Sequence, residues 1–332
     1  MTGSNDYYWN DFFSHVYVEE RAYGYPETES ILSNIKNKTV IPIKHYKDVF
    51  SPRQDFTLQK NSLKLILAVK DGGFLYKIPP VCLNYGNDDA YYVSLALNCP
   101  YDCAYCFLRG LYASANIVAF VNAEDAFGEI TRALKNKKPY LCVSYDTDLL
   151  AMEHILGTAR KWIRFARENP LIMMEIRTKS ANYNAIADLA PAPNVILAWS
   201  LSPEGYINAY ESGAPGLGAR LKNINRAADG GWNVRLCVDP LLYLPGCADV
   251  YRSFIKETFA QIPADKILDI SFGPLRAPAA VMKKIEKAKP GPLTAYPFVN
   301  QNGVYTYRDN HLHEIYDVIK SALPAMSAYF YR

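Results

Sequence analysis

Three cysteines lie close together on one short stretch of the chain. Cys99, Cys103 and Cys106 follow the spacing C-x3-C-x2-C, directly after the apolar run 91–97, which predicts a strand. Three thiolates on one loop can hold three irons of a four-iron, four-sulfur cluster, and the fourth iron is then left without a protein ligand. The spacing therefore predicts a [4Fe–4S] cluster with one iron open to a cofactor.

Zinc and unrelated free thiols are the alternative interpretations of these cysteines. Zinc usually takes four ligands, commonly as two C-x2-C pairs. No second short-spaced pair exists among the other cysteines, which are Cys82, Cys142, Cys237 and Cys247. We therefore expect the cluster rather than zinc.

An iron with an open position suits S-adenosylmethionine (SAM), whose amino and carboxylate groups can chelate it. One electron from the cluster then splits the sulfonium and yields a 5′-deoxyadenosyl radical, and this chemistry belongs to the cofactor. The cysteine spacing, with the aromatic Tyr105 before the last cysteine, resembles the signature of the radical-SAM superfamily. The resemblance implies a [4Fe–4S] cluster and SAM as the cofactors.

Length, charge and cysteine count restrict the class of protein. The chain has 332 residues, 50% of them hydrophobic, which suits one barrel-sized domain with an extension. Its 36 basic and 33 acidic residues nearly balance, and we expect the basic clusters at 135–138 and 283–289 to be solvated helix ends and faces. No signal-peptide pattern or membrane-length apolar run is present, and seven cysteines is an odd number. We expect a cytoplasmic protein.

Strand-like and helix-like segments alternate from residue 91 onward. The predicted strands are 91–97, 140–144, 171–177, 195–201, 233–238 and 267–271. Six such units imply a parallel sheet with right-handed crossovers, so we expect an α/β fold with a partial (β/α)6 barrel of the TIM type over 81–290. A small α/β extension over 1–80 precedes the barrel, and a cap over 291–332 follows it. Chemistry in such barrels lies at the carboxyl ends of the strands, where the cysteine loop falls.

Further short motifs are spread over nearly the whole chain. They are 16–22 with Tyr25-Pro26, 148–154, Thr178-Lys179, 199–202, Glu211, Gly213, Arg220 and 305–309. Together with the cysteine loop they resemble the spore photoproduct lyase family, a branch of the radical-SAM superfamily. The resemblance implies a radical-SAM barrel enzyme.

The same resemblance implies a set of residues that contact SAM. They are the backbone of Tyr105 and the side chains of Lys179 and Ser200, with Ser144 and Ser202 nearby. Lys179 directly follows a strand, which favours a place in the site over a surface salt bridge. Asp239 also ends a strand, where it could bind ribose or substrate or cap the next element.

Three positions depart from the family pattern at the parts that serve DNA repair. In lyases that repair the spore thymine dimer, a cysteine returns a hydrogen atom to the substrate radical, and Tyr145 stands at that position here. Phe107 replaces the relay tyrosine after the last cluster cysteine, and Val299-Asn300 align with the Arg-Tyr pair that engages the lesion. Cys142 is the one thiol that could compensate, but strand alternation over three positions directs it to the other face.

We therefore predict a radical-SAM enzyme whose substrate is not the spore lesion. One branch of lyase-like radical-SAM proteins acts on ribosomally made precursor peptides, and it includes spliceases that excise a tyrosine-derived unit. Tyr145 and Cys142 are the candidate catalytic residues, with Tyr145 packing on the peptide or steering its radical. The alternatives are DNA repair with a reorganised pocket, and a non-catalytic protein with a vestigial cluster.

The predicted partners follow from this chemistry. A precursor peptide could pair with an exposed strand edge or be delivered by a small peptide-recognition protein. An electron donor of the flavodoxin or ferredoxin type must supply the cluster. Nucleic acid is the less favoured partner, and no membrane contact is expected.

Overall fold

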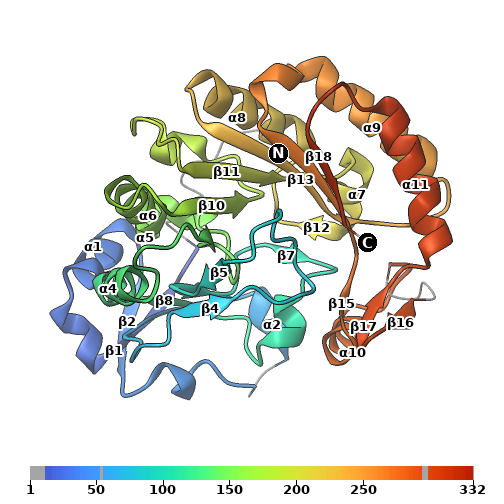
Figure 1. Cartoon of the computed structure of the whole chain (residues 1–332). Helices are drawn as coiled ribbons and strands as arrows, with labels where there is room; N and C mark the ends of the chain where they lie inside the picture. Colours follow the sequence, from blue (N-terminus) through green and yellow to red (C-terminus); the bar gives the residue numbers. More distant parts are fainter. Residues whose placement is uncertain (1–11, 53–54, 294–297, 332) are drawn as a thin grey trace.

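A curved eight-stranded sheet forms the centre of the molecule (Figure 1). The structure is a computed structural model, described for residues 12–52, 55–293 and 298–331. In spatial order the strands are β18 (Ala328–Phe330), β14 (Asp269–Pro274), β13 (Asn233–Leu241), β11 (Val195–Ser200), β10 (Met173–Thr178), β9 (Tyr140–Cys142), β5 (Ala90–Val93) and β4 (Leu75–Lys77). Only β4 is antiparallel to its neighbour. The six predicted strands are therefore adjacent and parallel, and the expected open barrel is confirmed.

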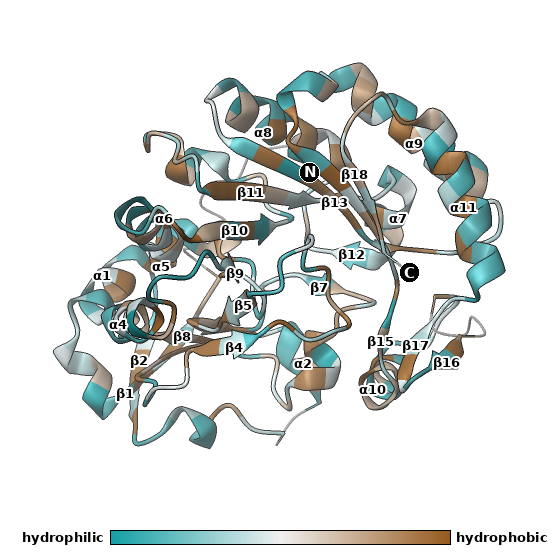
Figure 2. Ribbon diagram, in the orientation of Figure 1, coloured by the Kyte–Doolittle hydropathy of each residue, from teal (hydrophilic) through white to brown (hydrophobic). Residues whose placement is uncertain are grey.

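Helices cover the outer face of this sheet because each presents one apolar stripe to it. In α6 (Thr158–Glu168) the buried side chains include Trp162, Ile163 and Phe165, which recur at helical spacing. The other long helices of this layer are α4 (Ala123–Ala133), α8 (Leu217–Asp229), α9 (Cys247–Gln261) and α11 (Asp309–Ala322), whereas α10 (Ala279–Ala288) packs against α3 (Leu108–Leu111). Figure 2 shows hydrophobic residues on the sides of these helices that face the strands. No helix among the described residues is both long and apolar enough to cross a membrane.

A second sheet joins the N-terminal extension to the barrel region. Its strands, in spatial order, are β2 (Thr39–Ile43), β1 (His15–Glu19), β3 (Leu65–Ala68), β8 (Ile117–Phe120) and β6 (Ala96–Leu97). The predicted strand 91–97 is thus two strands in two sheets, since β5 joins β9 whereas β6 pairs with β8. An apolar run looks the same in the sequence whether one sheet or two bury it.

The remaining short α-helices and strands connect these larger elements. They are α1 (Pro26–Asn34), α2 (Phe56–Lys60), α3 (Leu108–Leu111), α5 (Glu153–Leu156), α7 (Glu204–Tyr210), β7 (Asp102–Cys103), β12 (Glu211–Ser212), β15 (Ala277–Pro278), β16 (Val299–Gln301) and β17 (Val304–Thr306). The strands β15, β17 and β16 form a small antiparallel sheet beside α10.

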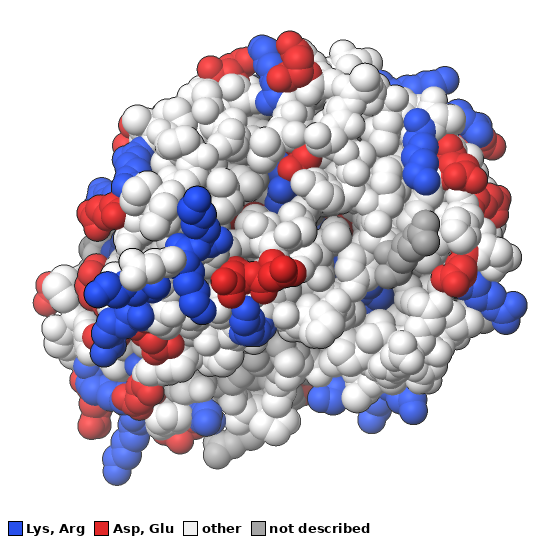
Figure 3. Space-filling model, viewed as in Figure 1, with Lys and Arg blue, Asp and Glu red and all other residues white. Residues whose placement is uncertain are grey.

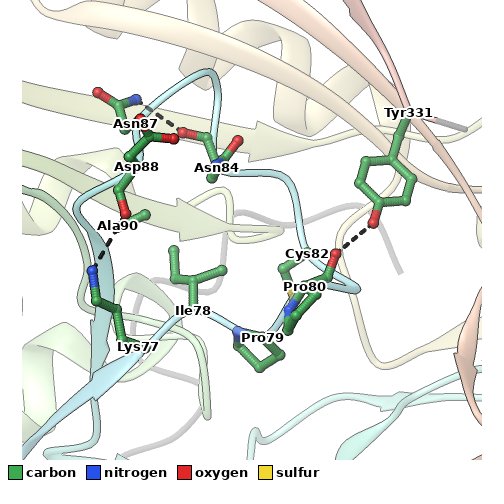
Figure 4. A pocket seen from close by; sticks show the side chains of 10 residues that line it. All are labelled: Lys77, Ile78, Pro79, Pro80, Cys82, Asn84, Asn87, Asp88, Ala90 and Tyr331. Atoms are coloured by element: carbon green, nitrogen blue, oxygen red, sulfur yellow. Dashed lines mark hydrogen bonds between the residues drawn. The ribbon is translucent and has the colours of Figure 1, made fainter.

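The C-terminal segment completes the edge of the barrel in addition to covering it. β18 adds a parallel strand beside β14, and the Tyr331 hydroxyl then donates a hydrogen bond to the Pro80 carbonyl at 2.7 Å. This contact joins the β18 edge of the open barrel to the segment before β5. A pocket of about 210 Å³ lies at the junction, with Lys77, Cys82 and Tyr331 among its lining residues (Figure 4).

Candidate active site

The cysteine loop between β6 and α3 is held by elements from distant parts of the chain. Its short strand β7 pairs with β12, which places Cys103 opposite Glu211. The Ala104 amide also donates to the Tyr210 carbonyl at 2.8 Å. From α2, the Lys60 ammonium donates to the carbonyls of Cys99 and Tyr101 at 2.6 and 2.7 Å. The loop therefore has a defined conformation that depends on tertiary contacts.

The three thiols fit a cluster in number and in kind. Cys103 is buried, and Cys99 and Cys106 are partly buried. Burial, followed by the charge of Glu211, raises the pKa of Cys103 to about 12, and burial raises the pKa of Cys99 as well. Thiolates in such surroundings need a cationic partner, and iron supplies one. Among the described residues, no three metal-ligating side chains are arranged around one point. The assignment of a cluster therefore depends on the number and kind of the three cysteine ligands.

Lys60→Met should weaken retention of the cluster without changing its ligands. The substitution removes both hydrogen bonds to the loop carbonyls, and outer contacts of this kind typically alter metal affinity by about 10-fold or more. We expect the reconstituted variant to lose iron to a chelator about 10-fold faster than the parent.

Lys64→Met is the matched control, because its ammonium contacts only the hydroxyl of Ser62 among the contacts described. Equal rates of iron loss in the Lys60 and Lys64 variants would contradict the role assigned to Lys60.

The predicted SAM residues meet around one buried carboxylate. The Tyr105 hydroxyl donates to the carboxylate of Glu211, and the Lys179 ammonium lies 3.6 Å from Glu211 Oε1 and 5.6 Å from the Tyr105 ring centre. The fully buried Arg220 pairs with the same carboxylate and donates to the Ser200 carbonyl at 2.9 Å. Tyr105 and Lys179 thus meet at Glu211, and Ser200 is linked to them through its backbone carbonyl and Arg220, while their contact with SAM stays a prediction.

Glu211 is the centre of this network, a role that the sequence analysis did not give it. Burial raises the pKa of the Glu211 carboxyl, but Lys179 and Arg220 lower it more, so the net shift is downward. Two cations around one carboxylate leave one positive charge, which can attract the carboxylate of a ligand. The sequence indicated only that Glu211 and Arg220 match positions of the family pattern. That match does not show that the two side chains are in contact.

The remaining predicted cofactor residues lie along neighbouring strand ends. At the end of β9, the Ser144 hydroxyl accepts from the Arg177 amide at 2.7 Å, and Ser202 is buried just beyond β11. Asp239 lies within β13, two residues before its end, because this strand is longer than predicted, and it pairs with Arg276 at 3.0 Å. A Cβ on Gly273 would lie 2.6 Å from Arg276 Nη1 and 2.9 Å from Asp239 Cγ, so a glycine there makes room for the pair.

A network of charged side chains fills the barrel interior and forms its floor, and Asp239 and Arg276 belong to this network. Arg235 of β13 contacts the Tyr140 hydroxyl of β9 at 2.6 Å, although two strands separate β13 from β9, so the contact crosses the interior. The ion pairs are Arg235 with Asp269 and Glu175, Arg177 with Glu175 and Asp239, and Arg276 with Asp239. Three arginines meet three carboxylates, so the barrel floor is balanced in charge. Cys142 lies here, with its thiol 3.9 Å from Glu175.

Tyr145 belongs to a row of four aromatic rings. Its ring centre lies 4.3 Å from that of Tyr92 and 5.3 Å from that of Phe107, and Tyr92 stacks on Tyr76 at 5.0 Å. This aromatic row leads from β4, at the edge of the sheet, to the residue that follows Cys106. Two positions that depart from the family pattern, Tyr145 and Phe107, are therefore in contact with each other.

Cys82 is a thiol that the sequence analysis missed. Its sulfur lies 3.5 Å from the Tyr145 hydroxyl oxygen, and it also lines the pocket at the open side of the barrel. Cys142, by contrast, contacts Glu175 on the barrel floor. The segment 78–89 around Cys82 has no recognisable motif, so only the fold reveals this contact.

The third departure, Val299-Asn300, lies in the hairpin of β16 and β17. The Asn300 side chain accepts a hydrogen bond from the Gly303 amide at 2.8 Å and thereby closes the turn. Neither side chain carries a charge, so this position offers no counterpart to an arginine.

Comparison with known proteins adds family and fold information. The model of the family described as spore photoproduct lyase matches residues 12–290. A solved spore photoproduct lyase mutant with bound AdoMet and dinucleoside spore photoproduct has a TM-score of 0.83 and 18% identity, over 97% of this chain and 98% of that chain. The lyase complexed with dinucleoside spore photoproduct has a TM-score of 0.82 and 19% identity, over 97% and 98%.

A more distant structural match is SuiB of Streptococcus suis bound to precursor peptide SuiA. Its TM-score is 0.51 at 13% identity, over 73% of this chain and 48% of that chain. Comparison with curated protein sequences gives no match.

Proposed function

Because this chain belongs to the spore photoproduct lyase family of radical-SAM enzymes, we propose that it cleaves C–C and C–N bonds in a ribosomally synthesised precursor peptide. The family establishes that the protein is an enzyme and a radical-SAM lyase. The substrate class, the site residues and the excision of a tyrosine-derived unit are our proposal.

The observation that carries the proposal is the neutral environment beyond the SAM network. The aromatic row presents rings next to the cluster loop, and the arginines of the barrel floor are each matched by a carboxylate. Asn300 is engaged in its own turn where a lesion contact would need a cation. DNA carries one charge per phosphate and favours unmatched Lys or Arg, whereas a peptide segment needs neither. The fold match to SuiB, whose structure holds a precursor peptide, is consistent with this choice.

Each site residue then has a proposed task. When bound, the cluster and SAM supply a 5′-deoxyadenosyl radical that removes a hydrogen atom from the substrate. Cys99, Cys103 and Cys106 hold the cluster. The proposed SAM contacts are Tyr105, Ser144, Lys179, Ser200 and Ser202, with Asp239 toward the ribose or substrate. Glu211 orients two of them through its contacts with Tyr105 and Lys179.

Tyr145 is proposed to pack on the peptide or steer its radical. Its ring lies between Phe107 and Tyr92, and its hydroxyl is in contact with the thiol of Cys82. Cys82 is therefore the thiol best placed to act together with Tyr145, and Cys142 on the barrel floor is the second candidate.

Repair of a thymine photoproduct is the second candidate function. It is favoured by the family match and by the TM-score of 0.83 to a lyase that holds the dinucleoside photoproduct. In that case the lesion would have to be held without the cysteine, the relay tyrosine and the Arg-Tyr pair of the family pattern.

A direct comparison of substrates tests the proposal. The reconstituted enzyme, SAM and a reductant are incubated in parallel with the precursor peptide encoded beside its gene and with dinucleoside spore photoproduct. We expect tandem mass spectrometry to show loss of a tyrosine-derived unit from the peptide, and no change in the photoproduct. Tyr145→Cys should not restore repair, because Val299-Asn300 still offers no arginine.

Formation of 5′-deoxyadenosine in both incubations verifies that the radical generator works. Efficient conversion of the photoproduct to two thymines by the unaltered protein would falsify the peptide proposal and support the second candidate.

A further inference from the structure

The exposed face of α10 carries a cluster of lysines that the proposed function does not use. Lys283, Lys284 and Lys287 are exposed on this helix, and Lys289 follows it. Glu286 is the one acidic residue in the helix. Lys283 and Lys287 are four positions apart and Lys284 and Lys287 are three apart, so both pairs are neighbours on the same side of the helix. We call Lys283, Lys284, Lys287 and Lys289 the lysine face. Figure 3 shows Lys and Arg side chains along the lower edge of the molecule, where Figure 1 places α10.

This helix packs directly against the segment that carries the cysteines. α3 begins two residues after Cys106, and its Gly110 is so close to α10 that an added Cβ would lie 2.5 Å from Val281 Cγ1. The Lys284 ammonium donates to the Gly110 carbonyl at 3.0 Å, and the Lys289 ammonium pairs with Asp102 of the cysteine loop at 2.6 Å. The lysine face and the cysteine loop are therefore one continuous structural unit.

Radical-SAM chemistry requires that one electron reach the cluster for each SAM cleaved. We propose that the lysine face is the docking surface for a small acidic one-electron carrier protein of the flavodoxin or ferredoxin type. In the transfer the carrier loses one electron and the cluster gains it, while the lysines form no bond and take up no proton. The inference rests on the radical-SAM chemistry of the family and is independent of whether the substrate is a peptide or DNA.

The chemistry of the surface suits a transient protein partner. Exposed lysines act as hydrated point charges that steer an oppositely charged protein and release it quickly, as a carrier that must leave after giving up its electron requires. The face has no arginine or aromatic residue to read nucleic acid by bidentate or stacking contacts. Its contacts lead to the cysteine loop, which is where an electron must arrive.

A pair of charge-reversal variants tests the proposal. Lys283→Glu/Lys287→Glu alters the two residues of the lysine face that have no described contact with α3 or the cysteine loop. Lys135→Glu/Lys138→Glu makes the same change of charge at the second basic cluster, which precedes β9 and is exposed. Each variant is assayed for 5′-deoxyadenosine formation with reduced flavodoxin as the electron source and, separately, with dithionite.

We expect the flavodoxin-dependent rate of Lys283→Glu/Lys287→Glu at low salt to fall about 10-fold or more, with loss of its salt dependence. The control variant should stay within about twofold of the parent, and dithionite-driven rates should be alike in all three proteins. Titration calorimetry with oxidised flavodoxin and the iron-free proteins should show weaker binding for Lys283→Glu/Lys287→Glu. The control variant should bind as tightly as the parent.

Unchanged flavodoxin binding and rates in Lys283→Glu/Lys287→Glu would overturn the proposal. So would a variant that loses affinity for a short DNA duplex but keeps its affinity for flavodoxin, because the face would then serve nucleic acid. Dithionite-driven SAM cleavage reports on the radical generator separately, so a failure here is distinct from a failure of the proposed peptide chemistry.

Discussion

Replacing Cys99, Cys103 and Cys106 together by alanine should reduce bound iron from about four atoms per chain to none and abolish SAM cleavage. The three thiols are the only closely spaced set in the sequence, and each would hold one iron of the cluster. The loop contains no fourth cysteine, so no other thiol nearby can take the place of a ligand that has been removed. Iron analysis after anaerobic reconstitution, together with the visible absorption of the cluster, measures the effect.

Cys247→Ala is a suitable control, because this cysteine is buried at the start of α9, outside the cysteine loop. It should retain the full iron content and the parent rate of 5′-deoxyadenosine formation. Purified protein that holds zinc and takes up no iron on reconstitution would show that the cluster assignment is wrong.

Glu211→Gln should lower the free energy of unfolding by about 3–5 kcal/mol and weaken SAM binding. The substitution keeps the shape of the side chain but leaves Arg220, which is fully buried, without its charged partner. The amide keeps only one of the two oxygens that accept from Tyr105 and Arg220, and it removes the charge that faces Lys179. Urea unfolding of the iron-free protein measures the stability, and equilibrium binding to the reconstituted protein measures the affinity for SAM.

Glu211→Gln/Arg220→Met separates the two effects. Removing both charges should recover most of the lost stability, because the fully buried charge of Arg220 is no longer left without a partner, whereas SAM binding should stay weak. If the single variant unfolds at the same urea concentration as the parent, the ion pair does not have the importance assigned to it.

The pH dependence of stability provides an independent check. The pKa of Glu211 is lowered in the folded protein, so its contribution is present above the pKa of an unfolded glutamate, about 4.3. The contribution is lost as the pH falls through the lower folded value. Glu211→Gln should therefore lose less stability than the parent between about pH 5 and pH 3.

Local patterns in the sequence were sufficient for the cluster loop and for the plan of the barrel. The spacing of three cysteines is a property of one short segment, and the donor set follows from it. Six alternating strand and helix patterns imply parallel neighbouring strands. The helix carries the chain back along the sheet, so the next strand runs in the same direction as the one before it. β9, β10, β11, β13 and β14 accordingly lie side by side and parallel.

The contacts that define the site were decided only by the tertiary structure. Tyr105 and Glu211 are 106 positions apart, and Cys82 and Tyr145 are 63 positions apart. Likewise, β6 and β8 join the N-terminal sheet although they follow residue 80. No periodicity or spacing encodes such pairs, because they depend on how whole strands and loops pack and on which buried charges must find partners. The sequence alone determined which radical chemistry the loop can support, and the packing of distant segments decided which side chains surround it.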